Sequence, residues 1–187
     1  MLKGLLPNDT MKTALYPGTF DPITNGHISL IKRGLDIFDR VIVAVAKDTP
    51  KTTLFSLEER VLLAQNSLKG QSRVSVEAFS GLTVEYALSK GACALLRGLR
   101  AVSDFEYEFQ LALMNRKLEH KLQTVFLMTD YKWLFISSTI IKSAASQGGS
   151  VKGLVPDIVR KRLEEIFAKP AKASEMEPDQ LVHAQRC

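Results

Sequence analysis

The sequence predicts a doubly wound α/β domain of the Rossmann-like class, built on a five-stranded parallel sheet. Short apolar or β-branched runs recur along the chain, and segments with the period of an amphipathic helix lie between them. Strands that are apolar throughout are buried on both faces. When such strands alternate with helices, they form parallel sheets with right-handed crossovers. The length of 187 residues suits one domain with a substantial core.

The predicted strands are Thr13–Gly18, Val41–Ala46, Arg73–Phe79, Ala92–Gly98 and Gln123–Met128. In doubly wound sheets, ligands bind outside the carboxyl ends of the strands, near the point where the strand order reverses. The polar and glycine-containing segments of this chain follow its predicted strands, so we expect the functional site at that edge. These segments are GTFDP, AKDTPKTTLF, FSGLT, RGLRAVSDFE and TDYKWLFISST.

Helical period appears in three segments between strands, each with apolar residues on one face. The faces consist of Ile28, Ile31, Leu35 and Phe38; of Leu57, Val61, Ala64 and Leu68; and of Tyr107, Leu111, Met114 and Leu118. The third set lies on a long helix, Ser103–His120, whose apolar residues could serve either the core or an interface.

Capping and breaking residues predict where the helices begin and end. S-x-x-E capping boxes begin at Ser56 and Ser103. Gly70 and Gly91 follow the second and third helices, where a left-handed residue is favoured. A last helix is expected to begin near Pro156 and to bury a stripe of three apolar residues, Val159, Leu163 and Ile166.

Composition is typical of a soluble globular protein, with 45% hydrophobic and 24% charged residues. No apolar run approaches the roughly 20 residues of a spanning helix, and the N-terminal run, broken by Pro7, is too short for a secretory signal. We therefore expect a cytosolic protein with no membrane partner. Cys93, inside an apolar strand, and Cys187 have neither metal-ligand spacing nor a disulfide pattern, so both are expected to be free thiols.

We expect three parts along the chain: an N-terminal extension at 1–11, a folded α/β domain at 12–168 and a disordered tail at 169–187. The tail mixes Pro, Ala, Ser and charged residues without a period. The extension precedes a second plausible start at Met11. The formal charge of +5 suits an anionic ligand but is spread along the chain. A nucleic-acid-binding protein would gather its cations on one face with aromatic residues, and that pattern is absent from the sequence.

The segment GTFDPITNGH joins the first strand to the first helix. Gly18 helps end the strand and lets the backbone pass close to a ligand. Thr24 or Asn25 can cap the helix, so that Gly26 and His27 lie in its first turn. The free N–H groups and the helix dipole make that turn an anion site and disfavour a charged imidazole. We therefore interpret His27 as a hydrogen-bond donor, although a histidine beside a glycine is more often structural when taken alone.

Three motifs in order carry a resemblance to a known family: LYPGTFDPITNGH, LLRGLRAVSDFEYEFQLALMNRKL and FISST. Thr24-Asn25-Gly26-His27 resembles the (H/T)-x-G-H signature of the nucleotidylyltransferase superfamily. Together the motifs resemble those of the bacterial phosphopantetheine adenylyltransferases, over about Lys12 to Phe167. A lone T-x-G-H would be weak evidence, whereas three ordered motifs that each follow a predicted strand are specific.

The resemblance implies a nucleotidylyltransferase fold and a reaction in which ATP and 4′-phosphopantetheine give dephospho-coenzyme A and pyrophosphate. It also implies Mg²⁺, held mainly by the ATP phosphates rather than by protein ligands, coenzyme A as a feedback ligand, and a homohexamer. The attacking phosphate is already ionised at neutral pH, so no general base is required. Catalysis then consists of holding two anions in line and neutralising the charge that develops.

Carried over residue by residue, the resemblance implies catalytic roles for His27, Thr19 and Lys51. His27 would donate to the α-phosphate in the transition state, Thr19 would place its hydroxyl between the reacting phosphates, and Lys51 would bind the pantetheine phosphate. The implied substrate-binding residues are Thr19, Lys51, Thr83 and Arg97. The implied nucleotide-binding residues are Thr19, Phe20, His27, Gly98, Leu99, Arg100, Glu108, Trp133, Leu134, Phe135, Ile136, Ser137, Ser138 and Thr139.

Structural explanations compete with some of these roles. Arg97 and Arg100 flank Gly98, whose missing side chain would let a ligand approach the backbone. Either arginine could form an ion pair with Asp104 or Glu106, and this is the less expected reading for Arg97.

Hydroxyl and aromatic residues also have structural readings. One of Ser137, Ser138 and Thr139 could simply cap a helix, but capping does not explain three hydroxyls. Thr83 could cap its helix, and Trp133 could be a packing residue. Leu134 stands where the family pattern has a more polar or aromatic residue.

Two other acceptors remain as alternatives within the superfamily, nicotinamide mononucleotide and an alcohol phosphate. The RGLRAVSDFEYE segment and the loop that contains Lys51 argue against both.

Overall fold

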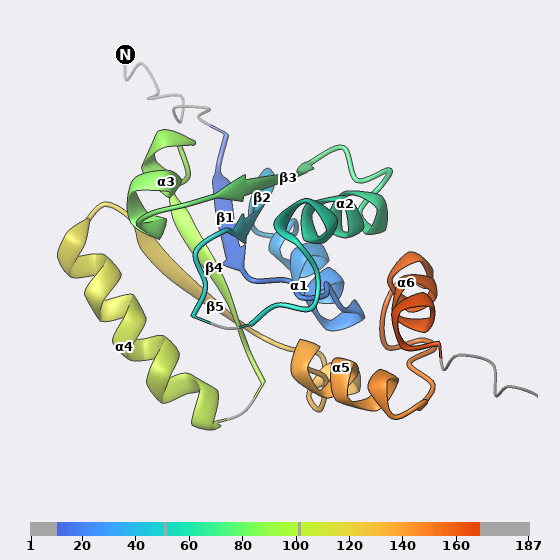
Figure 1. Ribbon diagram of the computed structural model, residues 1–187. Helices are drawn as coiled ribbons and strands as arrows, with labels where there is room; N and C mark the ends of the chain where they lie inside the picture. Colours follow the sequence, from blue (N-terminus) through green and yellow to red (C-terminus); the bar gives the residue numbers. More distant parts are fainter. Residues whose placement is uncertain (1–10, 51, 101, 169–187) are drawn as a thin grey trace, which may run out of the picture.

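The computed structural model describes residues 11–50, 52–100 and 102–168. Five parallel strands form one sheet in the order β3-β2-β1-β4-β5, which confirms the predicted fold class (Figure 1). The strands are β1 (Thr13–Gly18), β2 (Arg40–Ala46), β3 (Val74–Phe79), β4 (Ala94–Leu99) and β5 (Gln123–Met128). Their ends differ from the predicted runs by at most two residues. The predicted tail, and the extension up to residue 10, lie outside the described residues.

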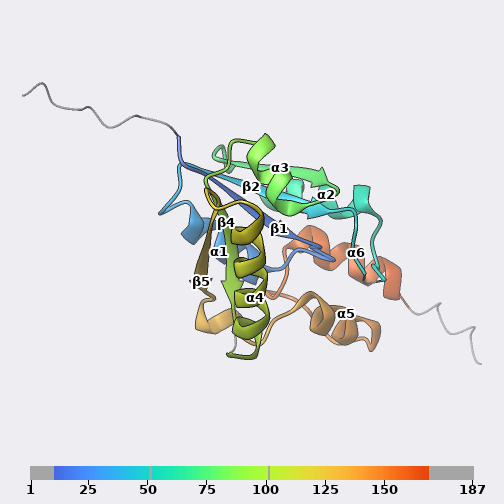
Figure 2. The same cartoon turned by 90° about the vertical axis from the view of Figure 1, so that its left-hand side faces the viewer.

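Helices cover both faces of the sheet, as Figure 1 and Figure 2 show from two directions. They are α1 (Asn25–Gly34), α2 (Leu57–Ser67), α3 (Thr83–Ser89), α4 (Val102–Leu118), α5 (Ser138–Ser146) and α6 (Asp157–Phe167), with a short 3₁₀ helix η1 (Tyr131–Trp133). Successive residues of β1 point to opposite faces. Ala14 and Tyr16 belong to the core that includes α1 and α2, whereas Leu15 belongs to the core that includes α3.

Most of the predicted helix signals are confirmed. Ser56 and Glu59 form the expected capping box of α2. Gly70 and Gly91 have φ angles of 90° and 65°, in the left-handed region that ends a helix. Pro156 precedes α6. The α6 stripe is partly confirmed, because Val159 and Leu163 are fully buried while Ile166 is only half-buried.

Three local expectations need correction. Helix α4 begins at Val102, one residue before Ser103. The side chain of Ser103 is not among those that the structure describes. Leu82 occupies the capping position of α3 without a side-chain bond, so Thr83 is the first helical residue and not its cap. Cys93 is exposed just before β4 instead of lying inside the strand, and it is a free thiol. Cys187 lies outside the described residues.

The predicted apolar face of α4 is not buried by this chain. Tyr107, Met114 and Leu118 are all more than half exposed. Helix α4 contacts β4 and β5 only along one side, and it carries apolar residues on several faces. The side that meets the cavity described below has residues at i, i+3, i+4, i+7, i+8 and i+11, which lie on one helical face. They are Asp104, Tyr107, Glu108, Leu111, Ala112 and Asn115, so Tyr107 and Leu111 of the predicted apolar face border the cavity.

The strand order reverses between β1 and β4, and their pairing is short. Only Ala14 with Ala94 and Leu15 with Leu95 are in register, whereas β1 and β2 pair along the whole of β1. The two strands therefore separate toward their carboxyl ends. This separation opens the sheet at the point where the predicted site residues follow β1 and β4.

Candidate active site

A cavity of about 720 Å³ lies at the carboxyl edge of the sheet. Its walls come from the ends of all five strands, the first turn of α1, one face of α4 and the start of α5. Most of the predicted site residues line it: Thr19, Phe20, His27, Thr83, Arg97, Gly98, Arg100, Glu108, Trp133, Ile136, Ser137, Ser138 and Thr139. Segments far apart in the sequence thus form one site.

Three predicted nucleotide-binding residues do not line this cavity. Leu99 is buried in β4, and Leu134 and Phe135 are exposed on the segment between η1 and α5. Lys51 lies outside the described residues, although its neighbour Pro50 borders the cavity. The pattern of the motif therefore locates the site but does not say which of its residues face inward.

A capping box orients the imidazole of His27. Thr24 caps α1, and the Nδ1 atom of His27 accepts a hydrogen bond of 3.0 Å from the backbone N–H of Thr24. Because that amide can only donate, Nδ1 must be the acceptor, and the proton of a neutral ring lies on Nε2. Phe20 packs edge-on against the ring, with centroids 5.1 Å apart. The first turn thus presents an N–H donor whose orientation is set by its own helix.

Burial keeps His27 uncharged at neutral pH. Removal from water, with a smaller contribution from the positive charge of Arg100, lowers the pKa of His27 from 6.5 to about 4. A neutral imidazole can donate from Nε2 but has no spare proton to release. This agrees with the interpretation of His27 as a hydrogen-bond donor.

The depressed pKa of His27 predicts a pH dependence of stability. Between pH 4 and pH 6.5 the unfolded chain binds a proton at His27 and the folded chain does not, so the free energy of unfolding rises with pH across this window. We expect the melting temperature of the wild type to fall more steeply from pH 7 to pH 4.5 than that of His27→Gln, which has no titrating ring. Parallel curves for the two proteins in thermal unfolding would contradict this. His120→Gln, which changes an exposed histidine, should follow the wild type.

Arg97 and Glu108 form a two-point ion pair between β4 and α4. Nε of Arg97 donates to Oε2 of Glu108 at 2.7 Å, Nη2 donates to Oε1, and Nη1 donates to the Pro17 carbonyl at 2.9 Å. Burial alone would lower the pKa of Arg97, but the bonds to Glu108 outweigh it and raise the pKa. Arg97 thus pairs with Glu108 and not with Asp104 or Glu106, the pairing that the sequence made less expected for it.

Arg100 does form the ion pair that competes with its predicted role. Its Nε donates to Asp104 at 3.1 Å, and its Nη1 donates to the carbonyl of Ile136 at 3.1 Å. The missing side chain of Gly98 has a packing reason as well. A Cβ atom there would lie 2.3 Å from Cδ1 of Leu30 on α1, so any larger residue would force the Leu30 side chain to move.

Two of the three predicted hydroxyls at the start of α5 form hydrogen bonds within the protein. Oγ of Ser137 caps the helix by accepting from the Ile140 N–H at 3.1 Å. Oγ of Ser138 donates to the carbonyl of Pro22 at 2.8 Å. The first-turn amides of α5 still lie at the cavity with the positive end of the helix dipole. An anion at this turn would therefore meet backbone amides and Thr139 more than the two serine side chains.

Comparisons with known proteins identify the family of the chain. A family model described as cytidylyltransferase-like matches residues 15–144. A phosphopantetheine adenylyltransferase of Oleidesulfovibrio alaskensis is 67% identical over 159 residues, which cover 85% of this chain and 94% of that protein. Proteins of the same name from Nitratidesulfovibrio vulgaris and Solidesulfovibrio magneticus are 68% and 58% identical, over 85% and 86% of this chain and 86% and 93% of theirs. The chain belongs to the phosphopantetheine adenylyltransferase family. It is an enzyme of the cytidylyltransferase-like class.

Some cavity residues of this phosphopantetheine adenylyltransferase family member were not predicted. Asp21, Lys142, Tyr16 and Asn115 all line the cavity. Asn115 lies seven residues after Glu108, so a helical period counted from Glu108 would have found it. Burial raises the pKa of Tyr16 to about 12, and its hydroxyl therefore stays protonated.

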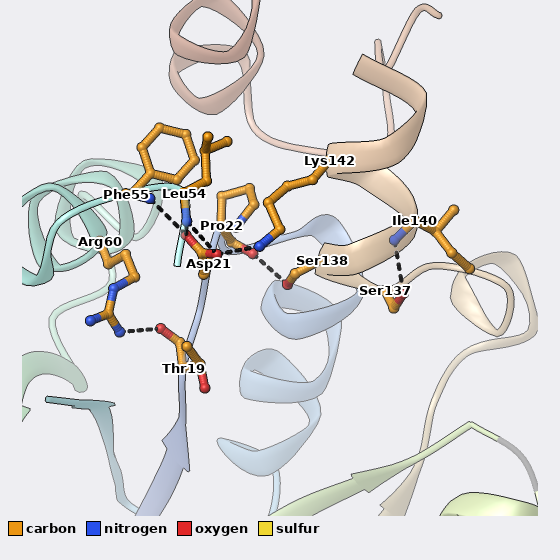
Figure 3. Close-up of polar contacts among 10 residues, drawn as sticks. All are labelled: Thr19, Asp21, Pro22, Leu54, Phe55, Arg60, Ser137, Ser138, Ile140 and Lys142. Atoms are coloured by element: carbon orange, nitrogen blue, oxygen red, sulfur yellow. Dashed lines mark hydrogen bonds and ion pairs between the residues drawn. The ribbon is translucent and has the colours of Figure 1, made fainter. Parts of the chain in front are cut away.

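Asp21 connects three segments of the site, as Figure 3 shows. Its carboxylate is 4% exposed and accepts from the backbone N–H groups of Leu54 and Phe55 at 3.0 to 3.1 Å. It also pairs with the ammonium group of Lys142 on α5. The sequence shows Asp21 directly after the GTF segment, a position that could have identified it as a candidate site residue. Its bonding partners lie too far away in the sequence to be predicted from that position.

Acidic side chains of the cavity are bonded to cations or backbone amides of the protein. Within residues 11–50, 52–100 and 102–168, no group of three or more His, Cys, Asp or Glu side chains could hold a metal ion. The buried carboxylate of Asp21 is engaged by two amides and Lys142. In the same described ranges, none of the helices is long and apolar enough to cross a membrane.

Proposed function

We propose that the protein transfers the adenylyl group of ATP to 4′-phosphopantetheine, giving dephospho-coenzyme A and pyrophosphate. The observation that carries this proposal is a neutral imidazole with its proton on Nε2, held by the Thr24 amide in a cavity shared with Thr19 and Arg97. The names of the close relatives favour this acceptor over nicotinamide mononucleotide or an alcohol phosphate. A nucleic-acid-binding role has no comparable support.

The residues account for the chemistry without proton abstraction. An ionised phosphate oxygen of the acceptor attacks the α-phosphorus of ATP, a P–O bond forms, and the bond to the β-phosphate oxygen breaks to release pyrophosphate. His27 donates from Nε2 to the α-phosphate as charge develops there, while the Thr19 hydroxyl lies between the reacting groups. The first-turn amides of α5 and the cationic side chain of Lys142 offer partners for the leaving phosphates. The positioning of two anions supplies the rest of the rate enhancement.

Several finer features belong to the same proposal. Lys51 and Arg97 bind the acceptor phosphate and Thr83 borders the pantetheine arm. An unchanged acceptor KM in Lys51→Ala would count against the first role. Mg²⁺ would be held mainly by the ATP phosphates and would neutralise part of their charge. If removal of Mg²⁺ with a chelator left the rate of pyrophosphate release unchanged, this role of Mg²⁺ would be excluded.

The exposed apolar side chains of α4, including Phe105 and Phe109, support a homo-oligomer, proposed to be a hexamer. Light scattering that finds a monomer would exclude this assembly. Coenzyme A is proposed to compete for the cavity, and the protein to work in the cytoplasm. Reaction kinetics that do not change when coenzyme A is added would contradict the first point. Recovery of the protein in the membrane fraction of its own cells would contradict the second.

A direct assay tests the proposed function. Purified protein is incubated with ATP, Mg²⁺ and one of three acceptors: 4′-phosphopantetheine, nicotinamide mononucleotide or an alcohol phosphate. Pyrophosphate release is measured and the nucleotide product is identified by mass. Stoichiometric pyrophosphate and dephospho-coenzyme A from the first acceptor alone is the expected result. Product from another acceptor, and none from phosphopantetheine, would overturn the proposal.

A further inference from the structure

Arg60 is a buried cation that belongs to no pair of the cavity. It lies on α2, is 3% exposed, and does not line the cavity. Its Nη1 donates to the backbone carbonyls of Thr19 at 2.8 Å and of Ala46 at 2.9 Å. Thr19 directly follows β1 and Ala46 is the last residue of β2. The guanidinium group therefore ties the ends of two neighbouring strands together where they meet the active site.

Stability alone does not favour an arginine at this position. Its Nε atom is buried and has no hydrogen-bond partner within the described residues, and a buried donor without a partner destabilises the folded state. A buried ion can often be replaced by apolar side chains of similar size without loss of stability. What an apolar side chain could not do is hold two carbonyl oxygens at fixed positions, which the rigid, planar guanidinium group can.

The backbone that Arg60 holds is strained. Phe20, directly after Thr19, has a φ angle of 48°, which is an outlier for a bulky side chain and persists only where its surroundings enforce it. The restraints lie on both sides of Phe20. Arg60 holds the carbonyl of Thr19 on one side, and the amides of Leu54 and Phe55 hold the carboxylate of Asp21 on the other.

Both restraints come from one short stretch of chain, residues 54–60, which leads into α2. Figure 3 shows the carbonyl of Thr19 directed at Arg60, while the Thr19 side chain points the other way. Thr19 itself lines the cavity. The contact with Arg60 therefore fixes the peptide from which the Thr19 hydroxyl projects, without occupying any part of the substrate site.

We propose that Arg60 is a positioning residue for adenylyl transfer, which acts through the Thr19 peptide to hold the Thr19 hydroxyl between the reacting phosphates. The inference rests on the proposed function, because it assigns Thr19 to the reacting groups. Arg60 touches no substrate. Its contribution should therefore appear in turnover and not in the affinity for ATP.

The test compares wild type with Arg60→Lys, which keeps the charge but cannot reproduce the planar two-carbonyl contact. Turnover is measured with both substrates saturating, ATP binding by calorimetry, and folding by circular dichroism and thermal unfolding. We expect kcat to fall about 10- to 100-fold, because small displacements of a reacting group have effects of that size. The Kd for ATP should change less than about threefold. Arg60→Gln, with donors but no charge, replaces the lysine variant if that variant does not fold.

A matched control and a double-mutant cycle separate positioning from general destabilisation. Arg73 also donates to a backbone carbonyl, that of Leu35 at 2.9 Å, away from the cavity. Arg73→Lys should keep kcat within about twofold of wild type. In a Thr19→Val background, Arg60→Lys should lower kcat by less than about twofold, because the group that it positions is gone.

Three results would overturn the inference: an unchanged kcat in a folded Arg60 variant, a loss of ATP affinity as large as the loss of turnover, or additive effects with Thr19→Val. A wild-type protein that forms no dephospho-coenzyme A would be a different failure. It would refute the proposed function and remove the basis of the inference with it.

Discussion

His27→Ala should lower turnover by about 10²- to 10³-fold, the usual effect of deleting one donor from a preorganised transition-state site. In the proposed mechanism the Nε2 proton of His27 faces a group whose charge grows only during the reaction, so the loss should fall on kcat and leave the Kd for ATP nearly unchanged. Turnover is measured by pyrophosphate release with both substrates saturating. Direct binding of ATP is measured by calorimetry.

The structure also predicts a modest loss of stability in His27→Ala. The ring accepts from the Thr24 N–H as half of a capping box, and a lost cap costs about 1 kcal/mol. Circular dichroism should confirm that the variant is folded before its rates are compared. His120→Ala, at an exposed position outside the cavity, should match wild type in rate. A large loss of ATP affinity with little loss of turnover in His27→Ala would contradict the assigned role.

Asp21→Ala should cause the largest loss of stability among single changes at the site. The substitution leaves one buried and one partly buried backbone amide and the ammonium group of Lys142 without their shared acceptor. Breaking a buried pair in this way costs about 3–5 kcal/mol. For a chain of this length, that corresponds to a fall of roughly 6–20 °C in melting temperature. Thermal and urea unfolding at pH 7 would measure it.

Asp39→Ala is the matched control for Asp21→Ala. Asp39 also accepts from a backbone amide, that of Lys12 at 2.7 Å, but its side chain is exposed. Its loss should cost no more than about 1 kcal/mol, because water can replace the bond. If Asp21→Ala were destabilised no more than Asp39→Ala, the buried network would contribute little to stability.

The sequence by itself determined the order of strands and helices, most helix boundaries and the position of the site. Each of these depends on neighbours in the chain. The capping of α2 by Ser56, the turn glycines Gly70 and Gly91, and the placement of Thr19 and His27 after β1 all follow from residues a few positions apart. Most of the site residues that the resemblance of the three motifs implied do line the cavity.

Only the tertiary structure decided which charges and hydrogen-bonding groups meet. Arg97 pairs with Glu108 and not with the nearer acids of its own motif. Asp21 meets Lys142 across 121 positions of sequence, and Arg60 meets the carbonyl of Thr19 across 41. Such contacts depend on how the packed sheet and helices set distances between remote segments, and local periodicity carries no information about those distances. The same reason explains why the outward apolar face of α4 and the inward one, with Glu108 and Asn115, could not be told apart beforehand.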